Sequence, residues 1–256
     1  DTIGPLAKNV EDLAIILEAI AGKDPKDGTS GNTPVPKYTD ALTGNLKGMT
    51  IGLPKEYFIE GIEKDVEEGI RASVKVLEEL GATIKEISLP HTQYAASTYY
   101  ILCPSEVSSN MARYDGIRFG HTTEGINNLN DYYTAVRSEG FGAEVKRRIL
   151  IGTYALSAGY FDAYYRKAQK VRTLITKDFE DAFASVDAII SPVGPNVSFK
   201  IGAHEGDPLA MYLEDVFTIP QVMAGIPALS VPCGFDSNNM PIGLQIMGPQ
   251  WGEEVV

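Results

Sequence analysis

The sequence predicts an α/β domain in which helices cover both faces of a mixed, mostly parallel sheet. An apolar segment at 50–53, a helical pattern at 62–80 and an apolar segment at 82–89 form a strand–helix–strand unit. A crossover of this length is right-handed and joins parallel strands. Further apolar segments with little alternation occur at 188–190, 229–232 and 242–247. Such segments are typical of strands that are buried on both faces.

The 256 residues contain no internal repeat and no evident linker, so we expect one domain over residues 1–256. The chain starts at Asp1, immediately ahead of a helical pattern, and stops at Val256, just after a strand-like segment. We therefore expect the C-terminal part of a longer domain, with an incomplete sheet. No apolar run approaches the roughly 20 residues of a membrane span, so no membrane partner is predicted.

Composition limits the classes of partner and cofactor. The chain has 22 basic and 34 acidic residues and a net charge of −12, which repels phosphate backbones and argues against a main role in binding nucleic acid. No phosphate loop, dinucleotide fingerprint or HExxH motif occurs, so the motifs indicate no free-standing catalytic site. The cysteines and histidines lack ligand spacing, which argues against a zinc site. These residues are Cys103, Cys233, His91, His121 and His204.

The helical elements follow from caps and periodicity. Asn9 and the pattern at 10–20 predict a capped helix that ends near Gly22, and 24–37 reads as a loop. The segment 92–112 predicts a helix broken at Pro104. Further helices are expected at 127–139, 142–152 and 208–217. The turn DSNNMP at 236–241 separates the last two strands.

A long amphipathic helix with an aromatic stripe is predicted after residue 159. Its apolar positions recur mostly at steps of three and four, and they are Tyr160, Phe161, Tyr164, Tyr165, Ala168, Val171, Leu174, Ile175 and Phe179. The dense charge at 144–148, next to apolar 149–151, suggests a helix that points a basic group inward. A solvated helix face is the simpler interpretation of that charge.

Three motifs carry a resemblance to a known family: YDGIRFG at 114–120, the segment RSEGFGAEVKRRILIGTYALSAGYFDAYYRKAQKVR at 137–172, and DPLAMYLEDVFTIPQVMAGIPALSVPCG at 207–234. They resemble the amidase-signature family, in particular the A subunits of glutamyl-tRNA(Gln)/aspartyl-tRNA(Asn) amidotransferases. The likeness extends from DTIGPLAKNVEDLAIILEAIAGKDPKDGTS at the start to PIGLQIMG near the end, two segments that many amidases share.

The resemblance implies the amidase-signature fold and a glutaminase activity. The complete enzyme would hydrolyse the side-chain amide of glutamine and supply ammonia to convert Glu-tRNA(Gln) or Asp-tRNA(Asn). Family members use a serine nucleophile, a second serine in a cis peptide and a lysine base, all of which would precede Asp1. No catalytic residue is then expected in this chain, and the chain alone is expected to be inactive.

The substrate pocket is the part of the site that the resemblance places in this chain. Arg148 would bind the α-carboxylate of glutamine, Asp215 its α-ammonium group, and Tyr99 would add a hydrogen bond near the reacting amide. Charge-assisted bonds of this kind reject amides that lack the amino-acid head group. Arg147 and Tyr100 remain alternatives, since a one-residue shift exchanges neighbours.

The resemblance also implies partners. These are the B and C subunits, with the tRNA held mainly by a partner. ATP and Mg²⁺ would be used on that partner, so the resemblance implies no cofactor bound by this chain. The enzyme would act in the cytoplasm or in an organellar matrix. A stand-alone amidase of other specificity and a non-catalytic scaffold without the catalytic residues remain alternatives.

Asp115 and Arg118 could pair in a structural loop near the pocket. Arg166, Lys167, Lys170 and Arg172 form a solvated helix face or contact tRNA phosphates.

Overall fold

The computed structural model describes residues 3–58, 61–203 and 206–256, which divide into two compact units. We call the unit formed by residues up to Pro90 and by Lys177–Val256 the sheet unit, and His91–Thr176 the helical unit. The prediction of one domain over 1–256 concerns both units together and stays a prediction. Asp1 and His204, which the sequence predictions mention, lie outside the described residues.

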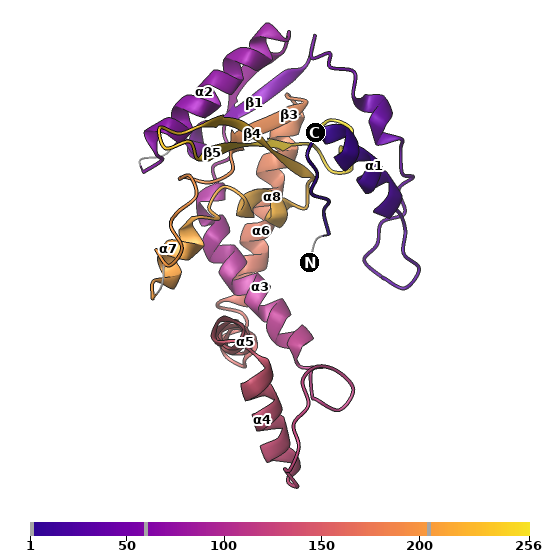
Figure 1. Cartoon of the computed structure of the whole chain (residues 1–256), viewed down its shortest axis with the longest axis vertical. Coiled ribbons are helices and arrows are strands. Elements are labelled where there is room, and N and C mark those ends of the chain that lie inside the picture. Colours follow the sequence, from indigo (N-terminus) through magenta and orange to yellow (C-terminus); the bar gives the residue numbers. More distant parts are fainter. Residues whose placement is uncertain (1–2, 59–60, 204–205) are drawn as a thin grey trace. The chain divides into compact units, whose positions relative to one another are not determined.

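The sheet unit is built on a mixed five-stranded sheet with the order β2-β1-β3-β5-β4 (Figure 1). Its strands are β1 (Thr50–Pro54), β2 (Thr83–Ile87), β3 (Ala188–Pro192), β4 (Ala228–Phe235) and β5 (Pro241–Met247). Strand β1 pairs in parallel with β2 and β3, whereas β5 pairs antiparallel with β3 and β4. The mixed sheet and the parallel β1–β2 pair are as predicted.

Helices cover both faces of this sheet. Helix α2 (Lys64–Glu79) lies above the strands in Figure 1, and α8 (Ile219–Ala224) lies below them. Ile70 of α2 is completely buried in a cluster with Ile51, Ile190 and Leu244. Gly69 lets α2 approach β5, because a Cβ there would lie only 3.2 Å from Ile242. The prediction of a sheet covered on both faces is confirmed.

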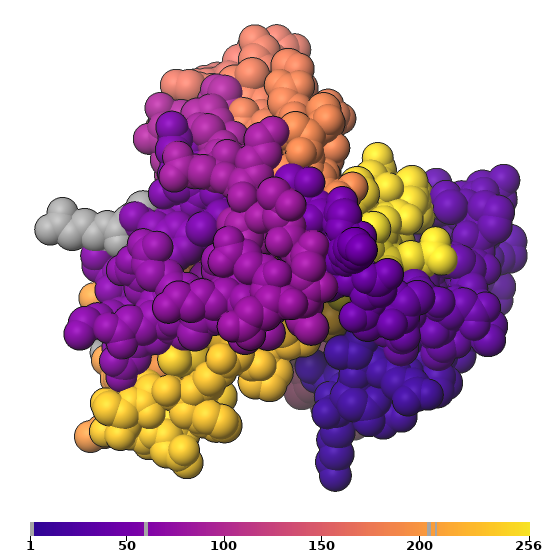
Figure 2. All heavy atoms as spheres, turned by 90° about the horizontal axis from the view of Figure 1, so that it is seen from above, coloured from indigo at the N-terminus to yellow at the C-terminus, as the bar shows by residue number. Residues whose placement is uncertain are grey.

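The N-terminal helix α1 (Val10–Ile20) is capped as predicted. The Asn9 side chain accepts a hydrogen bond of 2.8 Å from the backbone N–H of Asp12. In Figure 2 the yellow C-terminal residues lie beside violet N-terminal residues of the same unit. Gly31 permits this packing, since a Cβ there would lie 2.2 Å from the ring of Trp251. Short 3-10 helices occur at Tyr38–Ala41, Lys55–Tyr57 and Thr92–Tyr94.

The helical unit contains α3 (Ala95–Met111), α4 (Leu129–Gly140) and α5 (Ala143–Leu156), and the predicted break at Pro104 is wrong. Pro104 is buried inside a continuous α3. A Cβ on Gly152 of α5 would lie 1.9 Å from the Pro104 carbonyl oxygen, so the two backbones touch there. This close helix–helix packing offsets the hydrogen bond that proline cannot donate.

The predicted aromatic helix starts later than its pattern indicates. Helix α6 (Tyr165–Phe183) begins at Tyr165, and the three aromatic residues at 160, 161 and 164 lie in turns. They are partly exposed, and the Tyr160 ring packs 4.3 Å from the ring of Tyr154. The Ser157 hydroxyl donates to the Tyr154 carbonyl where α5 ends. This bond favours a turn at that point instead of a continuing helix. Only the later part of the stripe is buried, at Ala168, Ile175 and Phe179.

The hairpin of β4 and β5 closes on the predicted turn. The carboxylate of Asp236 accepts from the N–H of Met240 at 2.6 Å and from that of Asn238 at 2.9 Å. These bonds lower the pKa of Asp236. Asn239 has a φ of 65°, a left-handed conformation that asparagine tolerates.

Among the described residues, no helix combines the length and the apolar character needed to cross a membrane.

Candidate functional site

Asp215 lies in a turn of the sheet unit. The predicted helix at 208–217 is shorter than expected, because α7 spans Pro208–Leu213 and residues 214–218 turn before α8 begins. The carbonyl of Asp215 accepts from the backbone N–H groups of Thr218 and Ile219, each at 3.0 Å. The Asp215 side chain remains exposed. A carboxylate is thereby presented next to the start of a short helix.

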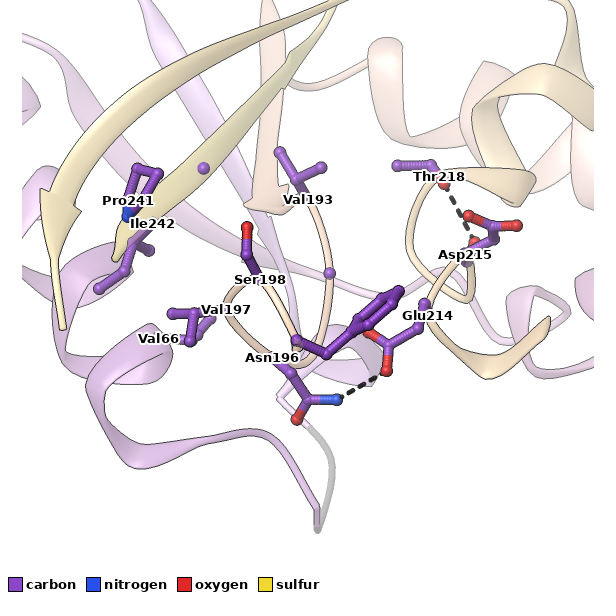
Figure 3. A pocket seen from close by; sticks show the side chains of 13 residues that line it. Val66, Val193, Asn196, Val197, Ser198, Glu214, Asp215, Thr218, Pro241 and Ile242 are labelled. Atoms are coloured by element: carbon purple, nitrogen blue, oxygen red, sulfur yellow. Dashed lines mark hydrogen bonds between the residues drawn. The ribbon is translucent and has the colours of Figure 1, made fainter. Parts of the chain in front are cut away.

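A cavity of about 270 Å³ lies beside this turn. Figure 3 shows Pro241 and Ile242 on one side of it and Glu214, Asp215 and Thr218 on the other, with the loop at 193–198 between them. The Asn196 side chain donates to Glu214 at 3.2 Å. The residues that line the cavity are Val66, Val193, Gly194, Asn196, Val197, Ser198, Phe199, Glu214, Asp215, Thr218, Pro241, Ile242 and Gly243. Apolar walls with two carboxylates suit a small ligand that carries a cationic group.

Buried side chains fix the turn against the sheet. Phe217 is 2% exposed, and its ring lies 5.4 Å from the ring of Tyr57. The amide nitrogen of Gln245 donates to the Phe217 carbonyl at 3.0 Å and to the Ser191 hydroxyl at 2.9 Å. The sequence predictions did not single out Gln245. The sequence does distinguish Gln245, because it is the one strongly polar residue in the apolar strand PIGLQIM.

Arg148 lies on α5 in the helical unit. Its Nε donates to Glu144 at 2.9 Å, and its guanidinium carbon lies 5.7 Å from the centre of the Tyr100 ring. Its side chain is 26% exposed, against 46% for Arg147, which also pairs with Glu144. The helix phase therefore places Arg148, rather than Arg147, against α3. Its role in binding substrate stays a prediction.

Tyr99 and Tyr100 of α3 are the aromatic neighbours of Arg148. Their rings are nearly perpendicular, at 88°, with centres 5.0 Å apart. Burial raises the pKa of Tyr99, and Cys103 raises it further, while neighbouring Arg148 opposes the shift. Partial burial acts against the charge of Arg148, but hydrogen bonds to Glu144 and Tyr99 outweigh it and raise the arginine pKa. The guanidinium thus stays charged and suits a carboxylate ligand.

The loop YDGIRFG is held by its backbone. The Asp115 carboxylate accepts from the N–H groups of Ile117 at 2.9 Å and of Arg118 at 3.1 Å, which lowers the pKa of Asp115. A Cβ on Gly116, where φ is 76°, would lie 2.8 Å from the His121 carbonyl oxygen. These contacts support the structural interpretation of the loop.

On the basic face of α6, Arg166 pairs with Asp162 at 3.0 Å.

The remaining candidate ligands show no cluster in the part of the chain that the structure describes. There, no group of three histidine, cysteine, aspartate or glutamate side chains could hold a metal ion. Cys103 and Cys233 are partly buried free thiols, and burial raises the pKa of Cys233. The predicted site residues thus form two groups, with Arg148 and Tyr99 in the helical unit and Asp215 in the sheet unit.

Comparison with known proteins gives a family and close relatives. The family model described as Amidase matches residues 1–256. The A subunit of glutamyl-tRNA(Gln) amidotransferase from Geobacillus kaustophilus (strain HTA426) is 56% identical over 256 residues, which are 100% of this chain and 53% of that protein. The chain thus spans about half the length of the curated relatives it matches.

Solved structures give the same picture. The crystal structure of the A subunit of glutamyl-tRNA(Gln) amidotransferase from Thermotoga maritima matches with a TM-score of 0.78 and 39% identity, and covers 100% of this chain and 50% of that one. A bacterial aryl acylamidase of the amidase-signature family matches with a TM-score of 0.73 and 20% identity, covering 98% of this chain and 50% of that one. The second likeness concerns the fold alone.

Proposed function

The chain belongs to the amidase family, and on that premise we propose that it is part of the glutamine-hydrolysing component of a tRNA-dependent amidotransferase, its A subunit. The observation that carries the proposal is the 56% identity, along the whole chain, to the corresponding glutamyl-tRNA(Gln) amidotransferase component. The complete enzyme hydrolyses glutamine and supplies ammonia for the amidation of Glu-tRNA(Gln) or Asp-tRNA(Asn). It acts in the cytoplasm or in an organellar matrix.

In this proposal the chain recognises the substrate. Arg148 binds the α-carboxylate, and its raised pKa and partial burial support this role, because a guanidinium that stays charged forms charge-assisted hydrogen bonds with a carboxylate. Asp215 binds the α-ammonium group, which is supported by its place on a cavity with apolar walls. Tyr99, whose pKa lies above its usual value, stays protonated and can donate to the substrate amide.

We propose that the serine nucleophile, the second serine and the lysine base lie in the part of the enzyme outside this chain. The nucleophile forms an ester with the glutamyl group and releases ammonia, and water then hydrolyses the ester. Backbone N–H donors stabilise the oxyanion in both steps.

Partners complete the proposed reaction. B and C subunits join the complete glutamine-hydrolysing component, and ATP and Mg²⁺ act on the partner, so this chain itself holds no cofactor. The net charge of −12 supports the assignment of tRNA binding mainly to a partner, because the chain repels a phosphate backbone.

The substitution Arg148→Ala in the complete enzyme tests the proposal. Loss of a charge-assisted hydrogen bond should raise the KM for glutamine roughly 10- to 100-fold and leave ammonia-supported amidation intact. Arg147→Ala is the matched control, since Arg147 shares the bond to Glu144 but is more exposed, and it should change KM little. Unchanged glutamine use by the Arg148→Ala enzyme would overturn the substrate assignment. Equal turnover of simple aliphatic amides by the wild-type enzyme would favour a stand-alone amidase.

A further inference from the structure

We propose that Gln245 is a positioning residue that fixes the turn at 214–218 and so sets the position of the Asp215 carboxylate in the cavity. The inference rests on the proposed function in one respect, because it takes Asp215 as the group that binds the substrate ammonium. The anchoring itself is a structural statement, and it can be tested without any assay of glutamine hydrolysis.

The strand alternation places Gln245 on the face of the sheet opposite α2. Leu244 belongs to the core cluster under α2, so the next residue along β5 points to the other face. Gln245 is directly opposite Ser191 in the antiparallel β3–β5 pair. Gln245 is 3% exposed and Ser191 is fully buried, so their hydrogen bond of 2.9 Å is shielded from water.

The second donor of the same amide group reaches the turn. The Gln245 side-chain nitrogen lies 3.0 Å from the carbonyl oxygen of Phe217, a residue 28 positions earlier in the chain. One amide therefore uses its two N–H groups to connect β3 to the turn. A buried polar group that has lost such a partner is costly, which keeps the peptide of Phe217 in this orientation.

This orientation is transmitted to Asp215 over two residues. The Asp215 carbonyl accepts from the N–H groups of Thr218 and Ile219, so residues 215–219 form one closed hydrogen-bonded turn. The Phe217 ring also packs on Tyr57, but ring packing is weakly directional. The hydrogen bond from Gln245 is directional, and it therefore sets the rotation of the turn about that buried ring.

The test compares Gln245→Met with Gln221→Met in the complete enzyme. Gln221 is the matched control because it is a similarly buried glutamine, in the adjoining helix α8, and its Oε1 has no hydrogen-bond partner among the described residues. Hydrogen exchange of a peptide covering 214–219, read by mass spectrometry, reports on the turn. The KM for glutamine and the rate of ammonia-supported amidation report on the function.

We expect Gln245→Met to speed exchange at 214–219 and to raise the KM for glutamine roughly 5- to 20-fold, with the ammonia-supported rate unchanged. Gln221→Met should change neither exchange in that peptide nor KM. Unchanged exchange in Gln245→Met, or an equal increase in Gln221→Met, overturns the anchoring role. A KM that stays constant while exchange rises overturns the positioning role.

Two further variants keep the outcome decisive. If Gln245→Met does not fold, the nearly isosteric Gln245→Glu places an oxygen opposite the Phe217 carbonyl, and the same two measurements apply. Asp215→Asn separates the failures. If Asp215→Asn leaves KM unchanged, the proposed role of Asp215 fails, and the exchange data still decide whether Gln245 anchors the turn.

Discussion

Arg148 is oriented by its own helix and the ring of Tyr100, whereas Asp215 is oriented by residues that are distant in the sequence. Glu144, which holds Arg148, precedes it by one helical turn. The turn of Asp215 depends on Gln245 and on the buried ring of Phe217. A local anchor contributes little to stability, while an anchor in the core contributes much. Substitutions in the two units should therefore differ in what they change.

The largest expected effect is that of Phe217→Ala. Truncation of a buried aromatic ring should destabilise the protein by about 3–5 kcal/mol. Phe235→Ala is the control, because Phe235 is 63% exposed and should cost less than about 0.5 kcal/mol. Denaturant-induced unfolding measures both. Similar losses for the two variants would contradict a core anchor under the turn of Asp215.

Gly152→Ala should have the next largest effect, in the helical unit. The added methyl group would lie 1.9 Å from the Pro104 carbonyl oxygen, so α3 and α5 must separate at a cost of about 1–3 kcal/mol. Gly142→Ala is the control, since a Cβ there meets nothing within 4 Å. Thermal melting of the two variants compares them. A Gly152→Ala protein as stable as the control would show that the helices adjust freely.

The pair of Arg148 and Glu144 should contribute about 0.5–1 kcal/mol in a double-mutant cycle, because partial exposure screens the charges. The pair of Lys177 and Asp181 has the same spacing and a similar distance of 2.9 Å, but it is more exposed. Its coupling should be smaller than that of the Arg148 pair, because solvent screens fully exposed charges. Equal couplings would mean that the surroundings of α3 add nothing to the local pair.

The smallest effect concerns Tyr154. The hydrogen bond with Tyr160 raises the pKa of Tyr154 to about 12, above the ordinary value of about 10. The associated stabilisation is fully present below the ordinary value and is lost as the pH rises through the folded-state pKa. Ultraviolet absorbance titration measures this pKa. Tyr160→Phe removes the first cause and should return the pKa towards 10, and an unchanged titration would contradict the assignment.

Local patterns predicted the strands, the Asn9 cap and the hairpin turn, because periodicity and turn chemistry act over a few residues. They failed where packing between distant segments decides. Pro104 remains helical because α5 packs closely on it through Gly152. The sequence pattern extended a helix over Asp215, where the structure has a turn. The pattern missed this turn because the turn is held by Gln245, which is distant in the sequence. The family resemblance pointed to Arg148, but the local pattern left Arg147 as an alternative, because the phase of the helix was known only to within one residue.

The order of the strands also constrains how the protein is made. β1 is synthesised before the helical unit, whereas its neighbour β3 follows only after that whole unit, and the Asp187 carboxylate that accepts from the Thr50 N–H is 137 residues later. At roughly 5–20 residues per second, a ribosome needs about 7–27 s to cover that interval. During this time the nascent chain exposes an unpaired edge of β1. Chaperone contact or slow translation would matter most in that window.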